Sequence, residues 1–241
     1  MANKIIKFFK KFIELLTPSG VGCINCGREI FEGELCSDCI KGFFTNDKRR
    51  CSRCSRPTIS VDDNICEQCK VLGETYFDKA FSPIVYTGVG LALLRKFKFH
   101  ERRDIGVYLA KFMASELRNI PPVDFMIAVP MWQGKFGARL YSTADELASN
   151  LSEITGLSYD KGVVIKTRDT VSQTELSGTS RLDNIKGSFR VKKRAFVKGK
   201  SVLVIDDVFT TGATTNEVAR VLKGAGANKV YVLTSTIAVK R

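Results

Sequence analysis

The sequence predicts an open parallel α/β sheet flanked by helices and preceded by a small cysteine-rich module. Three observations lead to this fold class. Eight cysteines are confined to residues 23–69. From residue 80 onward, short apolar runs alternate with segments of helical period, the pattern of a parallel sheet with crossover helices. One such run, residues 201–205, ends in the adjacent carboxylates Asp206 and Asp207.

Positive charge is concentrated in the second part of the chain. Residues 1–78 hold 12 Lys/Arg and 11 Asp/Glu, whereas residues 79–241 hold 26 and 14. This surplus predicts a polyanionic partner or an anionic substrate. No uncharged apolar run is long enough to predict a membrane span, and lysines interrupt the N-terminal apolar segment, unlike in a signal peptide. We expect a cytoplasmic protein with reduced cysteines; membrane association through partners stays open.

Residues 1–20 are predicted to form a basic amphipathic helix. Apolar side chains recur at helical spacing over residues 3–16 with four lysines among them, and Thr17-Pro18-Ser19-Gly20 ends the pattern. Such a helix packs on its own protein, docks a partner or lies on a membrane surface. We favour packing or partner docking.

Residues 21–78 are predicted to form a double zinc ribbon. Their cysteines make four C-x-x-C pairs, separated by nine, eleven and eleven residues. Each pair directs two sulfurs at one metal, so four pairs predict two four-cysteine Zn²⁺ sites that supply much of the folding energy. Sequential pairing is the simplest arrangement, although interleaved pairing stays open. The predicted ligands are Cys23, Cys26, Cys36, Cys39, Cys51, Cys54, Cys66 and Cys69.

Residues 79–241 are predicted to form the α/β domain. Apolar, β-branched runs bounded by turn formers indicate strands, and a period near 3.6 indicates helices. The polar stretch 167–188 is expected to be a functional loop, because long loops inside compact domains usually are. Strands are predicted at 80–86, 124–129, 162–166, 201–205 and 229–236, and helices at 89–97, 105–117, 142–155 and 216–224.

The stretch from Ser201 to Thr215 is predicted to carry a ligand site. Ligands of such sheets bind beyond the carboxyl ends of the strands, where Asp206 and Asp207 are expected. The Thr/Gly turn after them offers N–H groups and hydroxyls at a helix N-terminus, which binds phosphate. Two carboxylates suit sugar hydroxyls or a metal ion, so a ribose 5-phosphate fits both parts. The loop residues are Thr210, Thr211, Gly212, Ala213 and Thr214.

Two basic segments are candidates for nucleic-acid binding. The first interleaves cations with Phe97 and Phe99, which suits stacking on single-stranded bases; a solvated helix end with core phenylalanines is the alternative. The second, between Ile185 and Ile205, has seven cations and no acid, and is either a phosphate-contacting edge or a charged hairpin. The residues expected to contact DNA are Arg95, Lys96, Lys98, Arg102, Arg103, Lys192, Lys193 and Arg194.

Several motifs together resemble the ComF family of competence-associated, phosphoribosyltransferase-like proteins, of the ComFC and GntX types. The resemblance covers nearly the whole chain. Its last motif, Val204 to Thr214, also resembles the phosphoribosyl pyrophosphate (PRPP) motif of type I phosphoribosyltransferases. The motifs that carry it are the four cysteine pairs, Phe97-Lys98-Phe99, Val129-Pro130, the segment from Arg168 to Phe189, and the last motif.

The resemblance implies a type I phosphoribosyltransferase-like fold and a PRPP site with Mg²⁺ on the pyrophosphate. In this comparison Asp206 and Asp207 hold the ribose hydroxyls and are the catalytic candidates, while the Thr/Gly loop and Pro130 complete the PRPP site. Arg168 and Arg181 are candidates for contact with pyrophosphate or DNA.

The resemblance also favours a function in DNA uptake and natural transformation, with single-stranded DNA on the basic surface and a competence helicase or other uptake proteins as partners. The alternative is an active phosphoribosyltransferase with a nucleobase or amine acceptor. Where the family has several cations after Val-Pro, this chain keeps Lys135 and Arg139. This departure favours binding over turnover.

Overall fold

A computed structural model describes residues 21–47, 49–58, 64–132, 141–170 and 184–239 of the 241-residue chain. The predicted helix 1–20 lies outside these residues, as do Lys135, Arg139 and Arg181. The chain divides into two compact units, Met1–Gly42 and Phe43–Arg241.

The first unit contains a small hairpin and one short helix. Strand β1 (Val21–Gly22) pairs antiparallel with β2 (Glu29–Ile30), and α2 spans Ser37–Lys41. The turn after β1 closes through a hydrogen bond from the amide of Gly27 to the carbonyl of Cys23. Gly27 has a φ of 78°, a left-handed conformation that glycine adopts without steric cost.

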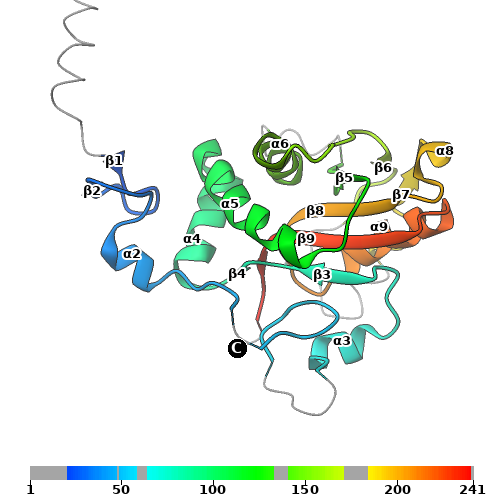
Figure 1. The fold of residues 1–241 in the computed structure, drawn as a ribbon, viewed down its shortest axis with the longest axis horizontal. Coiled ribbons are helices and arrows are strands. Elements are labelled where there is room, and N and C mark those ends of the chain that lie inside the picture. Colours follow the sequence, from blue (N-terminus) through cyan, green and yellow to red (C-terminus); the bar gives the residue numbers. More distant parts are fainter. Residues whose placement is uncertain (1–20, 48, 59–63, 133–140, 171–183, 240–241) are drawn as a thin grey trace, which may run out of the picture. The chain divides into compact units, whose positions relative to one another are not determined.

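The second unit is built on a parallel sheet of five strands (Figure 1). The strands lie in the order β3, β9, β8, β5, and β4 extends the line of β3 along the same partner β9. All of these pairings are parallel, which confirms the predicted open parallel sheet. The strands are β3 (Lys79–Phe81), β4 (Ile84–Val85), β5 (Phe125–Ala128), β8 (Ser201–Phe209) and β9 (Lys229–Ile237).

Helices cover both faces of this sheet. Helices α5 and α6 pack against each other and against β9 and β8, whereas α9 lies with β7 on the opposite face (Figure 1). A separate antiparallel pair joins β6 (Val164–Lys166) to β7 (Phe189–Val191). The helices are α3 (Glu67–Leu72), α4 (Gly88–Phe99), α5 (Arg103–Glu116), a 3₁₀ turn (Leu117–Asn119), α6 (Thr143–Thr155), α8 (Arg194–Val197) and α9 (Ala213–Gly224).

Three element boundaries differ from the sequence prediction for identifiable reasons. The strand expected at 80–86 splits into β3 and β4 around Pro83, which has no amide hydrogen for the ladder. Strand β8 continues past the two carboxylates to Phe209, because β9 pairs with it to that point. Helix α9 begins three residues earlier than expected, since Gly212, with a φ of 83°, takes the N-cap position.

The second set of four cysteines belongs to the core of the second unit. Cys51 and Cys54 lie in one hydrophobic cluster with Phe77, Phe209 and the apolar side chains of α9. The predicted boundary between the zinc ribbon and the α/β domain, at residues 78 and 79, stays a prediction. The boundary between the two compact units of the structure falls between Gly42 and Phe43. Half of the cysteine-rich region therefore packs as part of the α/β structure.

Within the described ranges, no helix combines the length and the apolar character needed to cross a membrane.

The packing of α5 against its neighbours depends on Gly106. A Cβ at this position would lie 2.8 Å from a ring carbon of Phe97, a side chain that is fully buried. We expect Gly106→Ala to lower the free energy of unfolding by about 1–3 kcal/mol, as overpacked cores do. Chemical denaturation measures this change. Gly224→Ala is the matched control, because its Cβ meets nothing within 4 Å; equal losses in both variants would contradict the packing argument.

Candidate functional site

The two carboxylates lie where the connections of neighbouring strands diverge. Beyond β5 the chain leads to α6 on one face, and beyond β8 it leads to α9 on the other. The last residues paired between these strands are Ala128 and Ile205, so the four final residues of β8 extend past β5. Such a switch point leaves a crevice in which α/β sheets bind ligands.

Asp207 is held by side chains from two other elements. The ammonium of Lys98, on α4, lies 2.8 Å from its Oδ1, and both side chains are less than one-fifth exposed. The hydroxyl of Thr143, in the first turn of α6, donates a hydrogen bond to its Oδ2. The carbonyl oxygen of Asp207 accepts from the hydroxyls of Ser235 and Thr236 on β9. Both the side-chain carboxylate and the backbone carbonyl of Asp207 therefore have partners within the protein.

Lys98 is the site residue whose role the sequence did not indicate. It was predicted as a DNA contact, and contact with DNA by this residue stays a prediction. In the Phe97-Lys98-Phe99 motif, Phe97 is fully buried, Lys98 reaches Asp207 and Phe99 is 61% exposed. Three successive side chains thus enter the core, the site and the solvent.

Asp206 is half-buried beside this ion pair, and its carboxyl group has a perturbed pKa. Burial raises the pKa first, and the negative charge of Asp207 raises it further. The amide of Asp207, which donates to Asp206 Oδ1 at 2.8 Å, and the charge of Lys98 act in the opposite direction. The resulting pKa is about 7. The two carboxyl groups therefore hold a proton that neutral pH readily removes.

The loop after β8 has a geometry that only glycine permits at its centre. Gly212 has a positive φ, and a Cβ there would lie 2.6 Å from the ring of Phe209. The hydroxyl of Thr211 accepts from the amide of Ala213, and the carbonyl of Gly212 accepts from Asn216. The loop is therefore a tight turn that leads directly into the N-terminus of α9, where the helix dipole favours an anion.

Of the other residues predicted for this region, Pro130 and Arg168 lie among the described residues and Arg181 lies outside them. Pro130 follows β5 and lines a cavity of about 340 Å³ together with Tyr159 and Lys192. The guanidinium of Arg168 donates to the carbonyls of Asn184 and Lys186, so it joins the two ends of the long polar segment.

Several of the predicted DNA contacts have interactions within the protein. Arg102 pairs with Asp104, Arg103 with Glu146, and Lys193 with Asp160. Arg194 donates to the carbonyl of Gly224, the last residue of α9. Arg95 is exposed on α4, near the exposed end of the Phe97-Lys98-Phe99 motif. DNA contact by these residues stays a prediction.

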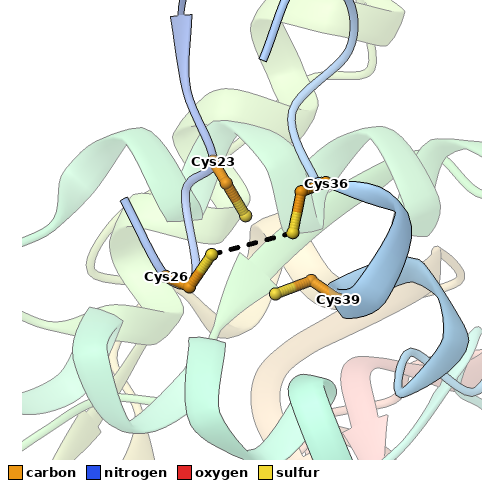
Figure 2. A group of neighbouring side chains, drawn as sticks. All are labelled: Cys23, Cys26, Cys36 and Cys39. Carbon is orange, nitrogen blue, oxygen red and sulfur yellow. Dashed lines mark hydrogen bonds between the residues drawn. The ribbon is translucent and has the colours of Figure 1, made fainter. Parts of the chain in front are cut away.

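The cysteines form two groups, and sequential pairing is confirmed. Within each group all four sulfurs lie within 4.8 Å of one another. Figure 2 shows the sulfurs of the first group converging on one point. The Sγ atoms of Cys26 and Cys36 are 3.7 Å apart, and those of Cys54 and Cys66 are 3.6 Å apart. Tetrahedral Zn²⁺ with bonds of about 2.3 Å requires sulfurs roughly 3.8 Å apart, so both groups fit zinc.

Polar hydrogens contact several of the sulfurs and favour their thiolate forms, although at Cys39 burial and the neighbouring cysteines outweigh the Asn25 hydrogen bond and raise the pKa. The amide of Asn25 donates to Cys39 Sγ, and the backbone N–H of Cys66 donates to Cys51 Sγ. Burial acts to raise the pKa of Cys23, but the backbone N–H groups around it outweigh burial and lower it to about 6. The C-x-x-C pattern indicated the ligands, whereas the role of Asn25 was not predicted.

Comparison with known proteins finds both parts of this architecture. Residues 138–237 match the phosphoribosyl transferase domain, and residues 12–70 match the double zinc ribbon domain. A solved structure, the glutamine PRPP amidotransferase of Bacillus subtilis with ADP and GMP, aligns with 59% of this chain and 30% of its own at a TM-score of 0.40 and 23% identity.

Relatives align with this chain over most of its length. The DNA utilization protein YhgH of Escherichia coli is 29% identical and covers 92% of this chain and 100% of the relative. Competence protein F of Haemophilus influenzae is 28% identical, covering 87% and 94%. Competence protein ComFC of Streptococcus pneumoniae is 24% identical, covering 81% and 84%.

The chain is therefore a zinc-ribbon protein with a phosphoribosyl transferase-type domain. Its relatives over most of its length include competence protein F and ComFC, which confirms the resemblance to the ComF family that its motifs carry.

The raised pKa of Asp206 gives stability a defined pH dependence. Between its ordinary value of 3.8 and about 7, the folded chain keeps this proton while the unfolded chain releases it. The contribution of Asp206 to the free energy of unfolding of the wild type therefore falls as pH rises across that window. We expect the difference in melting temperature between Asp206→Asn and wild type to increase in favour of the variant from pH 4 to 7. Above pH 7 this difference should stay constant. Glu153→Gln, at an exposed carboxylate of α6, is the control. Parallel pH curves for wild type and Asp206→Asn would refute the assignment.

Proposed function

We propose that this protein binds PRPP, or a similar ribose 5-phosphate, beyond the carboxyl ends of β5 and β8, and acts in DNA uptake. The observation that carries the proposal is the carboxylate of Asp207, which contacts the ammonium of Lys98 and the hydroxyl of Thr143 shortly before the tight turn at the N-terminus of α9. An ionised carboxylate removed from water needs compensating partners. A sugar ligand supplies hydroxyl donors to this carboxylate and a phosphate to the turn.

In this proposal each group has one task. Asp206 and Asp207 accept hydrogen bonds from the 2′- and 3′-hydroxyls of the ribose. The turn from Thr210 to Thr214 binds the 5-phosphate through its polar groups and the positive end of α9. Lys98 balances the charge of Asp207 and adds positive potential for the anionic ligand. Mg²⁺, which prefers oxygen ligands, would enter on the pyrophosphate of PRPP.

If the ligand turns over, pyrophosphate leaves C1 of the ribose as a nucleophile enters. The chain's contribution would then be to orient the ring and hold charges in place. Measuring pyrophosphate release separates turnover from binding alone.

The proposed role in DNA uptake rests on the relatives and on charge. Relatives over most of the chain are named DNA utilization protein and competence proteins. Residues 79–241 carry 26 Lys/Arg against 14 Asp/Glu, a surplus that attracts polyanions. Arg95 and Phe99 are exposed near the end of α4, which places a cation and an aromatic ring where single-stranded DNA can reach them.

Titration calorimetry with PRPP and Mg²⁺ tests the ligand. We expect saturable binding by wild type and a loss of at least tenfold in affinity for Asp206→Asn/Asp207→Asn, since charge-assisted hydrogen bonds each contribute about 1.5–3 kcal/mol. Lys98→Gln is expected to weaken binding because it leaves Asp207 without its counter-ion. Glu153→Gln is the matched control. No binding by wild type with its zinc loaded would refute the proposed ligand.

Fluorescence anisotropy with a labelled oligothymidine tests the DNA surface. We expect affinity to fall steeply with salt, and Arg95→Gln to flatten the log–log slope by about 0.7, the value for one phosphate contact on a single strand. Arg102→Gln, whose arginine pairs with Asp104, is expected to have the smaller effect. A salt-independent affinity, or equal slopes for wild type and Arg95→Gln, would contradict DNA contact through this surface.

A further inference from the structure

We propose that Arg56, held in place by the second zinc site, is a positioning residue for the phosphate-binding turn, so that metal at this site is required for ligand binding. The guanidinium of Arg56 donates a hydrogen bond to the carbonyl of Thr210, a residue 154 positions later in the chain. The identity of the ligand rests on the proposed function, whereas the coupling between the zinc site and the turn does not.

Arg56 is placed by the metal-binding segment itself. It follows Cys54 by two residues, and its carbonyl accepts from the amide of Cys51, so both cysteines of this C-x-x-C turn fix its backbone. The intervening Ser55 has a φ of 59°, a conformation that is uncommon for a non-glycine residue. Its hydroxyl donates to the carbonyl of Ala80 on the neighbouring β3.

The environment of Arg56 also suits an anion. The residue is 4% exposed, and its buried Nε–H has no acceptor among the described residues. A buried donor left unpaired is costly, and such groups in folded proteins usually have a reason. A cation buried beside the turn favours negative charge there, and this is the charge that a 5-phosphate brings.

Two further contacts hold the turn against the same segment. Before the turn, Phe209 meets Phe77 edge to face, with ring centroids 5.9 Å apart. After it, the side-chain oxygen of Asn216 accepts from the amide of Tyr76 at 2.7 Å. Thr210 and the two residues that flank the turn are thus contacted by Arg56, Phe77 and Tyr76, which lie within the second cysteine group or within eight residues after it.

Metal binding is expected to determine whether this segment keeps its shape. The four cysteines pack in the main core, but few large apolar side chains lie between them in sequence, so the metal–sulfur bonds are expected to supply much of the order within the segment. Loss of the metal releases Arg56, and the turn loses the group that fixes Thr210. By linkage, a ligand on the turn must also strengthen metal binding at this site.

The test compares two cysteine variants and two arginine variants. Cys54→Ser removes metal from the second site, and Cys23→Ser removes it from the first, which belongs to the other compact unit. Arg56→Gln removes the guanidinium while leaving every zinc ligand, and Arg56→Lys keeps the charge. The measurements are zinc content, calorimetry with ribose 5-phosphate and with PRPP and Mg²⁺, and amide hydrogen exchange over residues 210–213.

We expect two zinc ions in wild type and in Arg56→Gln, and one in each cysteine variant. Cys54→Ser and Arg56→Gln should lose at least tenfold in affinity and exchange faster in the turn, with Arg56→Lys partly restored. Cys23→Ser should bind as wild type does. If Cys54→Ser fails to fold, Arg56→Gln decides the question.

The outcomes separate the two proposals. If wild type binds no ligand, the proposed function is refuted. The coupling between the zinc site and the turn is then tested by amide hydrogen exchange in the turn. Arg56→Gln with wild-type exchange in the turn overturns the coupling whether or not a ligand binds. Unchanged affinity in Arg56→Gln, in a protein that does bind, also overturns it. Faster exchange in Arg56→Gln with zinc retained supports it.

Discussion

An ion pair at the end of a buried strand joins three elements of the α/β unit. A carboxylate taken out of water is unfavourable unless charge and hydrogen bonds replace the solvent. Asp207 receives both, from Lys98 on α4 and Thr143 on α6. The C-terminal end of α4 and the N-terminal end of α6 therefore both lie beside Asp207 of β8. These contacts connect α4 and α6 to β8 in addition to the packing of their apolar faces.

The cysteines of the second group are both predicted zinc ligands and part of the hydrophobic core of the same unit. Cys51, Cys54, Cys66 and Cys69 are all buried in the cluster that contains the side chains of α9 and the sheet. A metal site is usually described as a separate module that folds by itself, but here one of the two is continuous with the main core. The metal and the hydrophobic effect therefore stabilise overlapping sets of residues.

Local patterns in the sequence were sufficient for much of this structure, and long-range contacts were not. The alternation of apolar runs gave the parallel sheet, and the C-x-x-C spacing gave both sulfur groups. The partner of Lys98 is 109 positions away, and that of Arg56 is 154 away. Neither pairing leaves a periodic or spacing signal near the residue. The break at Pro83 was readable in principle, because a proline inside a predicted strand removes a ladder donor.

The two zinc sites differ in their contact with solvent, and this difference has a chemical consequence. Cys26 of the first group is exposed, whereas every sulfur-bearing residue of the second group is buried. Oxidants and chelators attack accessible thiolates first. We expect the first ribbon to lose its metal earlier under oxidative stress or zinc shortage, while the α/β unit remains loaded. The first site, with its exposed cysteine, would then lose its metal under conditions in which the buried second site retains it.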